Sequence, residues 1–133
     1  MGFLELFKKG ERKKEGKAED IALPWVLLEK EGQIEDIKKE SEERLVAIFK
    51  HSTRCGISRM AFSMFQKDFD RDWDDKVKVY VLDILSYRSI SNEIAVRFQV
   101  IHESPQLLLI KKGVTVYHAS HHAINAASIE EFI

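Results

Sequence analysis

Residues 45–58 read Leu-Val-Ala-Ile-Phe-Lys-His-Ser-Thr-Arg-Cys-Gly-Ile-Ser and join an uninterrupted apolar run to the single cysteine of the chain. The run from Leu45 to Phe49 is bounded by charged residues, which is typical of a central strand covered on both faces. The segment from Cys55 to Phe69 carries apolar residues three and four positions apart, so it predicts a helix. The stretch therefore predicts a strand-to-helix junction with Cys55 at the start of the helix.

Segments on both sides of this junction continue the alternation of strands and helices. Further strands are predicted at residues 25–28, 77–82, 106–110 and 115–118, the last two as a hairpin about Gly113. Helices are predicted around residues 34–41, after Ser91 as an N-cap, and at residues 128–133. In the helix of residues 55–69, the side chains expected to face the core are Ile57, Met60, Ala61, Met64, Phe65 and Phe69.

This order of elements predicts an α/β fold with a central mixed β-sheet and helices on both faces. The strand-helix-strand units at the front imply right-handed crossovers and parallel strands, whereas the closing hairpin adds antiparallel strands. A chain of 133 residues with 44% apolar and 32% charged residues has the composition of one globular domain. We place this domain at residues 23–133.

Residues 1–22 are predicted to form a basic, flexible N-terminal arm. Residues 8–17 read KKGERKKEGK, with six basic and two acidic side chains. A solvated tail is one interpretation, and a weak amphipathic membrane anchor through Phe3, Leu4, Leu6 and Phe7 is the other, so no firm membrane association is expected. The formal net charge of -1 argues against a nucleic-acid partner, because such binding rests on a basic surface.

Cys55 is the main candidate catalytic residue. A lone cysteine cannot form an intramolecular disulfide, and a reducing, cytoplasmic location fits it best. A helix N-terminus stabilises a thiolate, Arg54 adds a cation, and the Ser58 hydroxyl can donate to the sulfur. Thr53, Gly56 and Ile57 complete the candidate site, and Ser58 stands where a dithiol oxidoreductase carries its second cysteine. The alternative is a cysteine that serves only as a small buried apolar residue.

Ser104 and Pro105 form a second candidate feature, because they lie immediately before a predicted strand. A proline there removes one hydrogen-bond donor from the sheet and allows a cis peptide bond. The alternative is an ordinary proline at the start of a strand. His51 and His102 precede the two motifs, and each is a candidate proton or charge partner of Cys55 or a structural hydrogen-bonding residue.

Other polar residues give weaker signals. Asp83, late in its predicted strand, is either a buried acid behind the cysteine or an ordinary strand-end residue. His118, His121 and His122 match no zinc-binding spacing, so a solvated histidine loop is expected and no metal is assigned.

Three separated motifs resemble the YtxJ family of bacillithiol-system redox proteins, the monothiol bacilliredoxins. They are Phe49 to Ser58, Ser91 to Ala95, and His102 to Gln106, followed by Gly113 and the run from His118 to His121. The resemblance covers about residues 24–125 and implies a thioredoxin-like fold, in which a cis-proline faces the cysteine and the preceding residue docks substrate. It also implies removal of bacillithiol from S-bacillithiolated client proteins, with Cys55 as the nucleophile, bacillithiol as co-substrate and no bound cofactor. Recycling would then use a low-molecular-weight thiol or a dithiol redox partner.

Gly56 departs from this family, which commonly has proline after the cysteine. A proline would pre-set the start of the helix, whereas glycine loosens it. The tetrapeptide Cys55 to Ser58 also resembles the C-G-F-S site of monothiol glutaredoxins, which hold a [2Fe-2S] cluster with an external thiol. The alternatives are therefore such a cluster carrier or a thiol-sensing adaptor domain without turnover.

Overall fold

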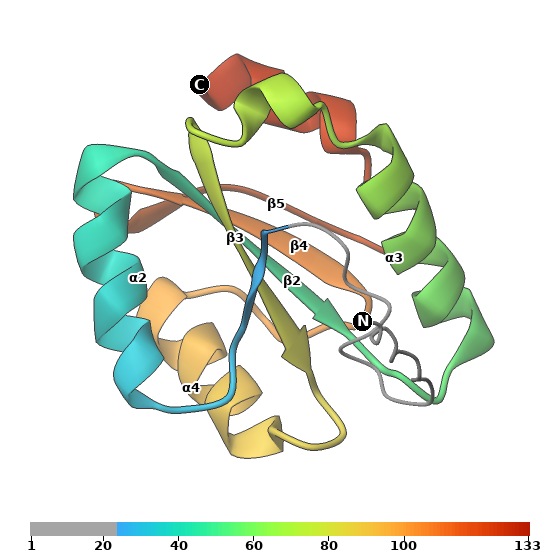
Figure 1. Cartoon of the computed structure of the whole chain (residues 1–133). Coiled ribbons are helices and arrows are strands. Elements are labelled where there is room, and N and C mark those ends of the chain that lie inside the picture. Colours follow the sequence, from blue (N-terminus) through green and yellow to red (C-terminus); the bar gives the residue numbers. More distant parts are fainter. Residues whose placement is uncertain (1–23) are drawn as a thin grey trace, which may run out of the picture.

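A five-stranded mixed sheet forms the centre of the protein in the computed structural model, which describes residues 24–133 (Figure 1). The strands are β1 (Val26–Leu27), β2 (Leu45–His51), β3 (Val77–Asp83), β4 (Gln106–Lys111) and β5 (Val114–Ser120). Their order is β1-β3-β2-β4-β5, with β1, β3 and β2 parallel and with β4 antiparallel to both β2 and β5. The predicted α/β class, the parallel front and the closing hairpin are confirmed. The predicted arm, residues 1–22, and residue 23 lie outside the described residues.

Helices cover both faces of the sheet. Between residues 24 and 133, the α-helices are α2 (Gly32–Glu43), α3 (Gly56–Asp68) and α4 (Arg88–Phe98), and the 3-10 helices are η2 (Arg71–Trp73), η3 (His121–Ala123) and η4 (Ala126–Phe132). Figure 1 shows α2 and α4 on one side of the sheet and α3 on the other. No helix within residues 24–133 has the length and apolarity needed to cross a membrane.

Strand β2 separates two apolar cores. All seven of its residues are buried, as expected for a central strand with neighbours on both edges and both faces. Because side chains alternate along a strand, Ala47 and Phe49 pack in the core that contains α3 and η4, whereas Val46 and Ile48 pack in the core of α2 and α4. The end of β2 therefore presents neighbouring residues to opposite halves of the protein.

The buried face of α3 differs from the prediction. Ile57, Met60 and Met64 are 69%, 65% and 56% exposed, so the expectation that they face the core is wrong. The side chains that α3 buries are Ser58, Phe62 and Phe65, and Phe69 follows them at the helix end. Two neighbouring stripes satisfy the helical spacing, and the large aromatic rings take the inner one because they remove more apolar area from water.

Two other helix predictions need correction. Helix α4 begins at Arg88 with Tyr87 as its N-cap residue, so Ser91 lies inside the helix and is completely buried. The C-terminal segment is a 3-10 helix that begins at Ala126, two residues before the predicted start. The hairpin is confirmed: its turn contains Lys112 and Gly113, both with positive φ, where glycine has no steric penalty.

Candidate active site

Cys55 occupies the predicted junction between β2 and α3. It is the N-cap residue of α3 with an extended backbone, φ -101° and ψ 122°. Its N–H donates to the Ser52 carbonyl at 3.3 Å, and its carbonyl accepts the Arg59 N–H at 2.9 Å. Cys55 has a free thiol and is exposed. The neighbouring residues Arg54, Gly56 and Ile57 are also exposed. The structure therefore places an accessible sulfur at the start of a helix, where unpaired backbone N–H groups are available to an anion.

Ser58 holds the loop that carries Cys55. Its side chain is 1% exposed, and its Oγ accepts the Ser52 N–H at 2.8 Å. This bond ties the residue after β2 to the first turn of α3 and shapes the loop between them. Because Oγ acts as the acceptor here, the hydroxyl proton is the group that Ser58 offers to another acceptor.

The loop before β4 lies at the same edge of the sheet as Cys55. Gln106 pairs with Lys50 near the end of β2, so Pro105 stands beside the strand that leads to the cysteine. The Ser104–Pro105 bond is cis, and Pro105 is buried. The Pro105 carbonyl accepts the His121 N–H at 3.1 Å, while Ser104 Oγ is buried with no hydrogen-bond partner in the described part of the chain.

An apolar groove connects Pro105 with the exposed stripe of α3. Its volume is about 600 Å³, and it is lined by Ile57, Met60 and Met64 on one side and by Pro105 and the residues from His121 to Ala126 on the other. Ile57, Met60 and Met64, which were predicted to face the core, therefore line a surface groove between α3 and the loop that contains Pro105.

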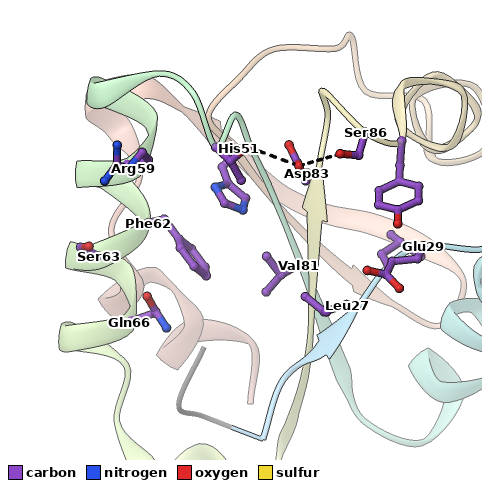
Figure 2. Close-up of a pocket in the computed structure, with 13 residues that line it drawn as sticks. Leu27, Glu29, His51, Arg59, Phe62, Ser63, Gln66, Val81, Asp83 and Ser86 are labelled. Atoms are coloured by element: carbon purple, nitrogen blue, oxygen red, sulfur yellow. Dashed lines mark hydrogen bonds between the residues drawn. The ribbon is translucent and has the colours of Figure 1, made fainter. Parts of the chain in front are cut away.

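A second cavity, of about 620 Å³, lies on the other side of α3 (Figure 2). Arg59, Ser63 and Gln66 line it from α3, and Leu27 and Val81 line it from the sheet. Thr53, from the loop before Cys55, also reaches this cavity. Helix α3 thus carries a polar exposed face on one side and an apolar exposed face on the other.

His51 lies at one end of the polar cavity. Its ring is 7% exposed and stacks on Phe62 with a centroid distance of 4.6 Å, and Figure 2 shows it pointing between Phe62 and Val81. Burial lowers the pKa of His51, although the nearby Asp83 carboxylate acts in the opposite direction. Burial therefore favours the neutral form of the imidazole. Its Nδ1 has no hydrogen-bond partner among residues 24–133.

Asp83 is linked to the cysteine loop through Thr53. It ends β3 directly beside His51 in the sheet, and its carboxylate accepts the Thr53 hydroxyl at 3.4 Å and the Ser86 hydroxyl at 3.1 Å. The Leu85 N–H donates to the other carboxylate oxygen at 3.1 Å. Asp83 is half-buried, and the structure gives it the role of organising the two loops at this edge of the sheet.

His102 lies apart from His51, on the α4 side of the sheet. Its Nδ1 is 3.1 Å from Ser91 Oγ. Burial lowers the pKa of His102, and the cations Lys50 and Arg88 lower it further, while Glu103 opposes them. The two histidines predicted as partners of Cys55 are therefore on opposite faces, and among the described residues neither has a hydrogen bond to Cys55.

Lys50 is the polar residue that the sequence reasoning missed. Its side chain is completely buried, its Nζ donates to the Ser91 carbonyl at 3.2 Å, and burial together with Arg88 lowers its pKa to about 8. The sequence signal that could have identified Lys50 is its position directly after the apolar run, because β2 continues through Lys50 to His51. No group of three or more metal-ligating side chains occurs in the range 24–133.

Comparisons with known proteins agree with this geometry. A protein described as an oxidoreductase with a thioredoxin fold has 30% sequence identity and a TM-score of 0.67, with 80% of this chain and 90% of that chain covered. A thioredoxin from Malassezia sympodialis has 20% identity and a TM-score of 0.63, covering 80% and 85% of the two chains. Thioredoxin O2 from Arabidopsis thaliana has 19% identity and a TM-score of 0.60, covering 80% and 89%.

The two thioredoxins show the fold alone, and the family follows from a separate match. The model of the monothiol bacilliredoxin family matches residues 26–129, which include Cys55, the cis Ser104–Pro105 bond and all five strands. This chain has a thioredoxin fold and belongs to the monothiol bacilliredoxin family.

Proposed function

We propose that this protein is a monothiol oxidoreductase that removes bacillithiol from S-bacillithiolated client proteins in the cytoplasm. The observation that carries the proposal is the exposed thiol of Cys55 at the start of α3, at the same edge of the sheet as the cis Ser104–Pro105 bond. Membership of the monothiol bacilliredoxin family supports bacillithiol as the co-substrate, with no resident cofactor.

The reaction consists of two thiol-disulfide exchanges. The Cys55 thiolate attacks the bacillithiol sulfur of the client mixed disulfide, a new S–S bond forms, and the client sulfur leaves as a thiolate. A free bacillithiol thiolate then attacks the bacillithiol sulfur on Cys55, which releases bacillithiol disulfide and regenerates the Cys55 thiolate. A dithiol redox partner could provide the two electrons in place of the free thiol.

The residues around Cys55 have separate roles in this proposal. The N–H groups at the start of α3 and the Arg54 cation support the Cys55 thiolate when it departs. Ser58 and Thr53 fix the loop through their bonds to Ser52 and Asp83. Ser104 and Pro105 dock the client segment next to the apolar groove, because a buried proline beside exposed Ile57 and Met60 offers an apolar contact surface.

Mass spectrometry of a bacillithiolated client tests this function directly. The wild-type protein is expected to form one adduct with the mass of bacillithiol on Cys55 and to release it when free bacillithiol is added. Cys55→Ser should leave the client modified, and Lys67→Ala, at an exposed position of α3 outside both cavities, should still remove bacillithiol. Removal by Cys55→Ser would refute the mechanism, and a stable adduct that added thiol cannot release would favour an adaptor domain without turnover.

A further inference from the structure

The polar cavity beside α3 has the features of a ligand site. It contains about 620 Å³, and its lining combines one cation, Arg59, with the hydroxyl groups of Thr53 and Ser63. The carboxylates of Asp83 and Glu29 line the opposite side. Polar groups that converge on one cavity of this size are typical of a site for a small polar molecule.

A second observation comes from His51 at the end of this cavity. The side chain is more than nine-tenths buried, and its Nδ1 has no partner in the described residues. A buried ring nitrogen without a partner is costly, and such groups are usually satisfied by a water molecule or a ligand. In Figure 2 the ring of His51 points into the space between α3 and the sheet.

The cavity adjoins the loop and the helix turn that carry the reactive cysteine. Thr53 lies two residues before Cys55, and Arg59 donates its backbone N–H to the Cys55 carbonyl at 2.9 Å. Arg59 makes no ion pair with any residue of the described chain, whereas both oxygens of Asp83 already accept hydrogen bonds from its own loops. An anionic group in the cavity would therefore meet the guanidinium of Arg59, which has no ion-pair partner in the described chain and stands in the first turn of α3 after Cys55.

We propose that this cavity binds the non-peptide half of the mixed disulfide, the sugar and dicarboxylate portion of bacillithiol. The inference rests on the proposed function and adds to it the binding site of the small thiol. Bacillithiol joins cysteine to an amino sugar and malate, so it offers carboxylates to Arg59 and hydroxyl groups to Thr53, Ser63 and Asp83. An apolar substituent would offer no partner to Arg59 or to the buried Nδ1 of His51.

This assignment separates the two halves of the substrate across α3. The polar stripe of Arg59 and Ser63 faces the cavity for the small thiol, and the apolar stripe of Met60 and Met64 faces the groove beside Pro105. The client polypeptide and bacillithiol would thus leave Cys55 in opposite directions. Discrimination between small thiols would be determined on the polar side alone.

The test compares two disulfides that modify Cys55 in the full-length protein. Bacillithiol disulfide carries the carboxylates, whereas 2-hydroxyethyl disulfide carries none. Arg59→Gln should lower the rate with bacillithiol disulfide about tenfold, because one charge-assisted hydrogen-bonding group is lost. It should leave the rate with 2-hydroxyethyl disulfide unchanged. Lys67→Gln, which removes an exposed cation from the same helix, is the matched control and should change neither rate.

The outcomes distinguish this inference from the proposed function. Equal losses with both disulfides would show that Arg59 acts on the sulfur rather than on the ligand, and no loss would show that the ligand does not use it, so either result overturns the cavity assignment. A wild-type protein that leaves bacillithiolated clients unchanged would instead refute the function.

Binding of glucosaminyl malate, the thiol-free part of bacillithiol, to the Cys55→Ser chain gives an independent readout. It should shift the NMR resonances of the His51 ring but not those of His118, which is exposed on β5. Absence of a shift at His51 would also overturn the assignment.

Discussion

Replacing Lys50 by methionine should stabilise the protein near neutral pH. Lys50 is completely buried, and burial together with Arg88 lowers its pKa from 10.5 to about 8. Each pKa unit corresponds to about 1.4 kcal/mol, so keeping this ammonium charged in the folded state costs about 3 kcal/mol at pH 7. Methionine has a similar length without the charge. The substitution also removes the hydrogen bond from Lys50 Nζ to the carbonyl of Ser91, a residue within α4.

The advantage of the Lys50→Met variant should depend on pH in a defined direction. Below about pH 8, Lys50 is protonated in the folded and the unfolded protein, so the full cost applies. Between about pH 8 and about pH 10.5, the folded protein binds fewer protons than the unfolded chain, and the wild type gains stability relative to the variant. We expect the variant to be about 2 to 3 kcal/mol more stable at about pH 7 and to lose most of this advantage by about pH 10.

Urea denaturation of both proteins across this pH range measures the effect. Trp25 and Trp73 are buried, so their fluorescence reports unfolding, and groups common to both proteins cancel in the difference. Lys67→Met, at an exposed position of α3, is the control and should show no such pH dependence. A stability difference that stays constant from neutral to alkaline pH, or a variant less stable than the wild type at neutral pH, would refute the account of Lys50.

Three further experiments, two of them with a matched control, test the packing of α3 and the cysteine loop. Gly56→Pro should raise the free energy of unfolding by about 0.5 to 1 kcal/mol in urea titrations, because Gly56 is the first residue of α3 and an added Cβ meets nothing within 4 Å; destabilisation would contradict this. Ser58→Ala should cost about 1 kcal/mol by removing the acceptor of the Ser52 N–H, while Ser63→Ala should be neutral in the same titration. Phe65→Ala should lower the free energy of unfolding by about 3 to 5 kcal/mol, whereas Met64→Gln should lower it by less than about 0.5 kcal/mol. Similar losses for the two variants would disprove the observed orientation of α3.

The order of the elements was predictable from the sequence because β2 and β3 contain uninterrupted apolar runs, Leu45 to Phe49 and Val79 to Leu82. The five consecutive apolar residues from Leu45 to Phe49 offer no polar face to solvent, so a central strand was the consistent interpretation, and the structure buries all seven residues of β2. The place of Cys55 at the start of α3 followed from the same pattern, since the polar loop before it ends directly at the helix.

The orientation of α3 could not be predicted, because the helix has two apolar stripes. Met60 and Met64 satisfy helical spacing as well as Phe62 and Phe65 do, and only packing against Phe49 and Trp25 decides between them. The Ser91 prediction failed for a related reason. A serine near the expected start of a helix is typical of an N-cap, but this serine is paired with His102 in the interior.

The polar groups of the site depend on contacts that join distant parts of the chain. The Thr53 bond to Asp83 spans 30 positions, and the Lys50 bond to Ser91 spans 41. No local pattern shows such pairs. The sequence predicted His51 and His102 as candidate partners of Cys55 but not the alternation of strand side chains that directs Lys50 and His51 to opposite faces.

Ser58 in place of a second cysteine has a kinetic consequence for the proposed function. A dithiol protein would resolve its mixed disulfide within one molecule, at a rate independent of other thiols. Here Cys55 is exposed and is the single cysteine of the chain, so its release requires collision with another thiol. The release rate is then first order in the concentration of free thiol, and the fraction of the protein held as the mixed disulfide rises when that concentration falls. Under the proposed function, the occupancy of Cys55 would follow the size of the reduced thiol pool.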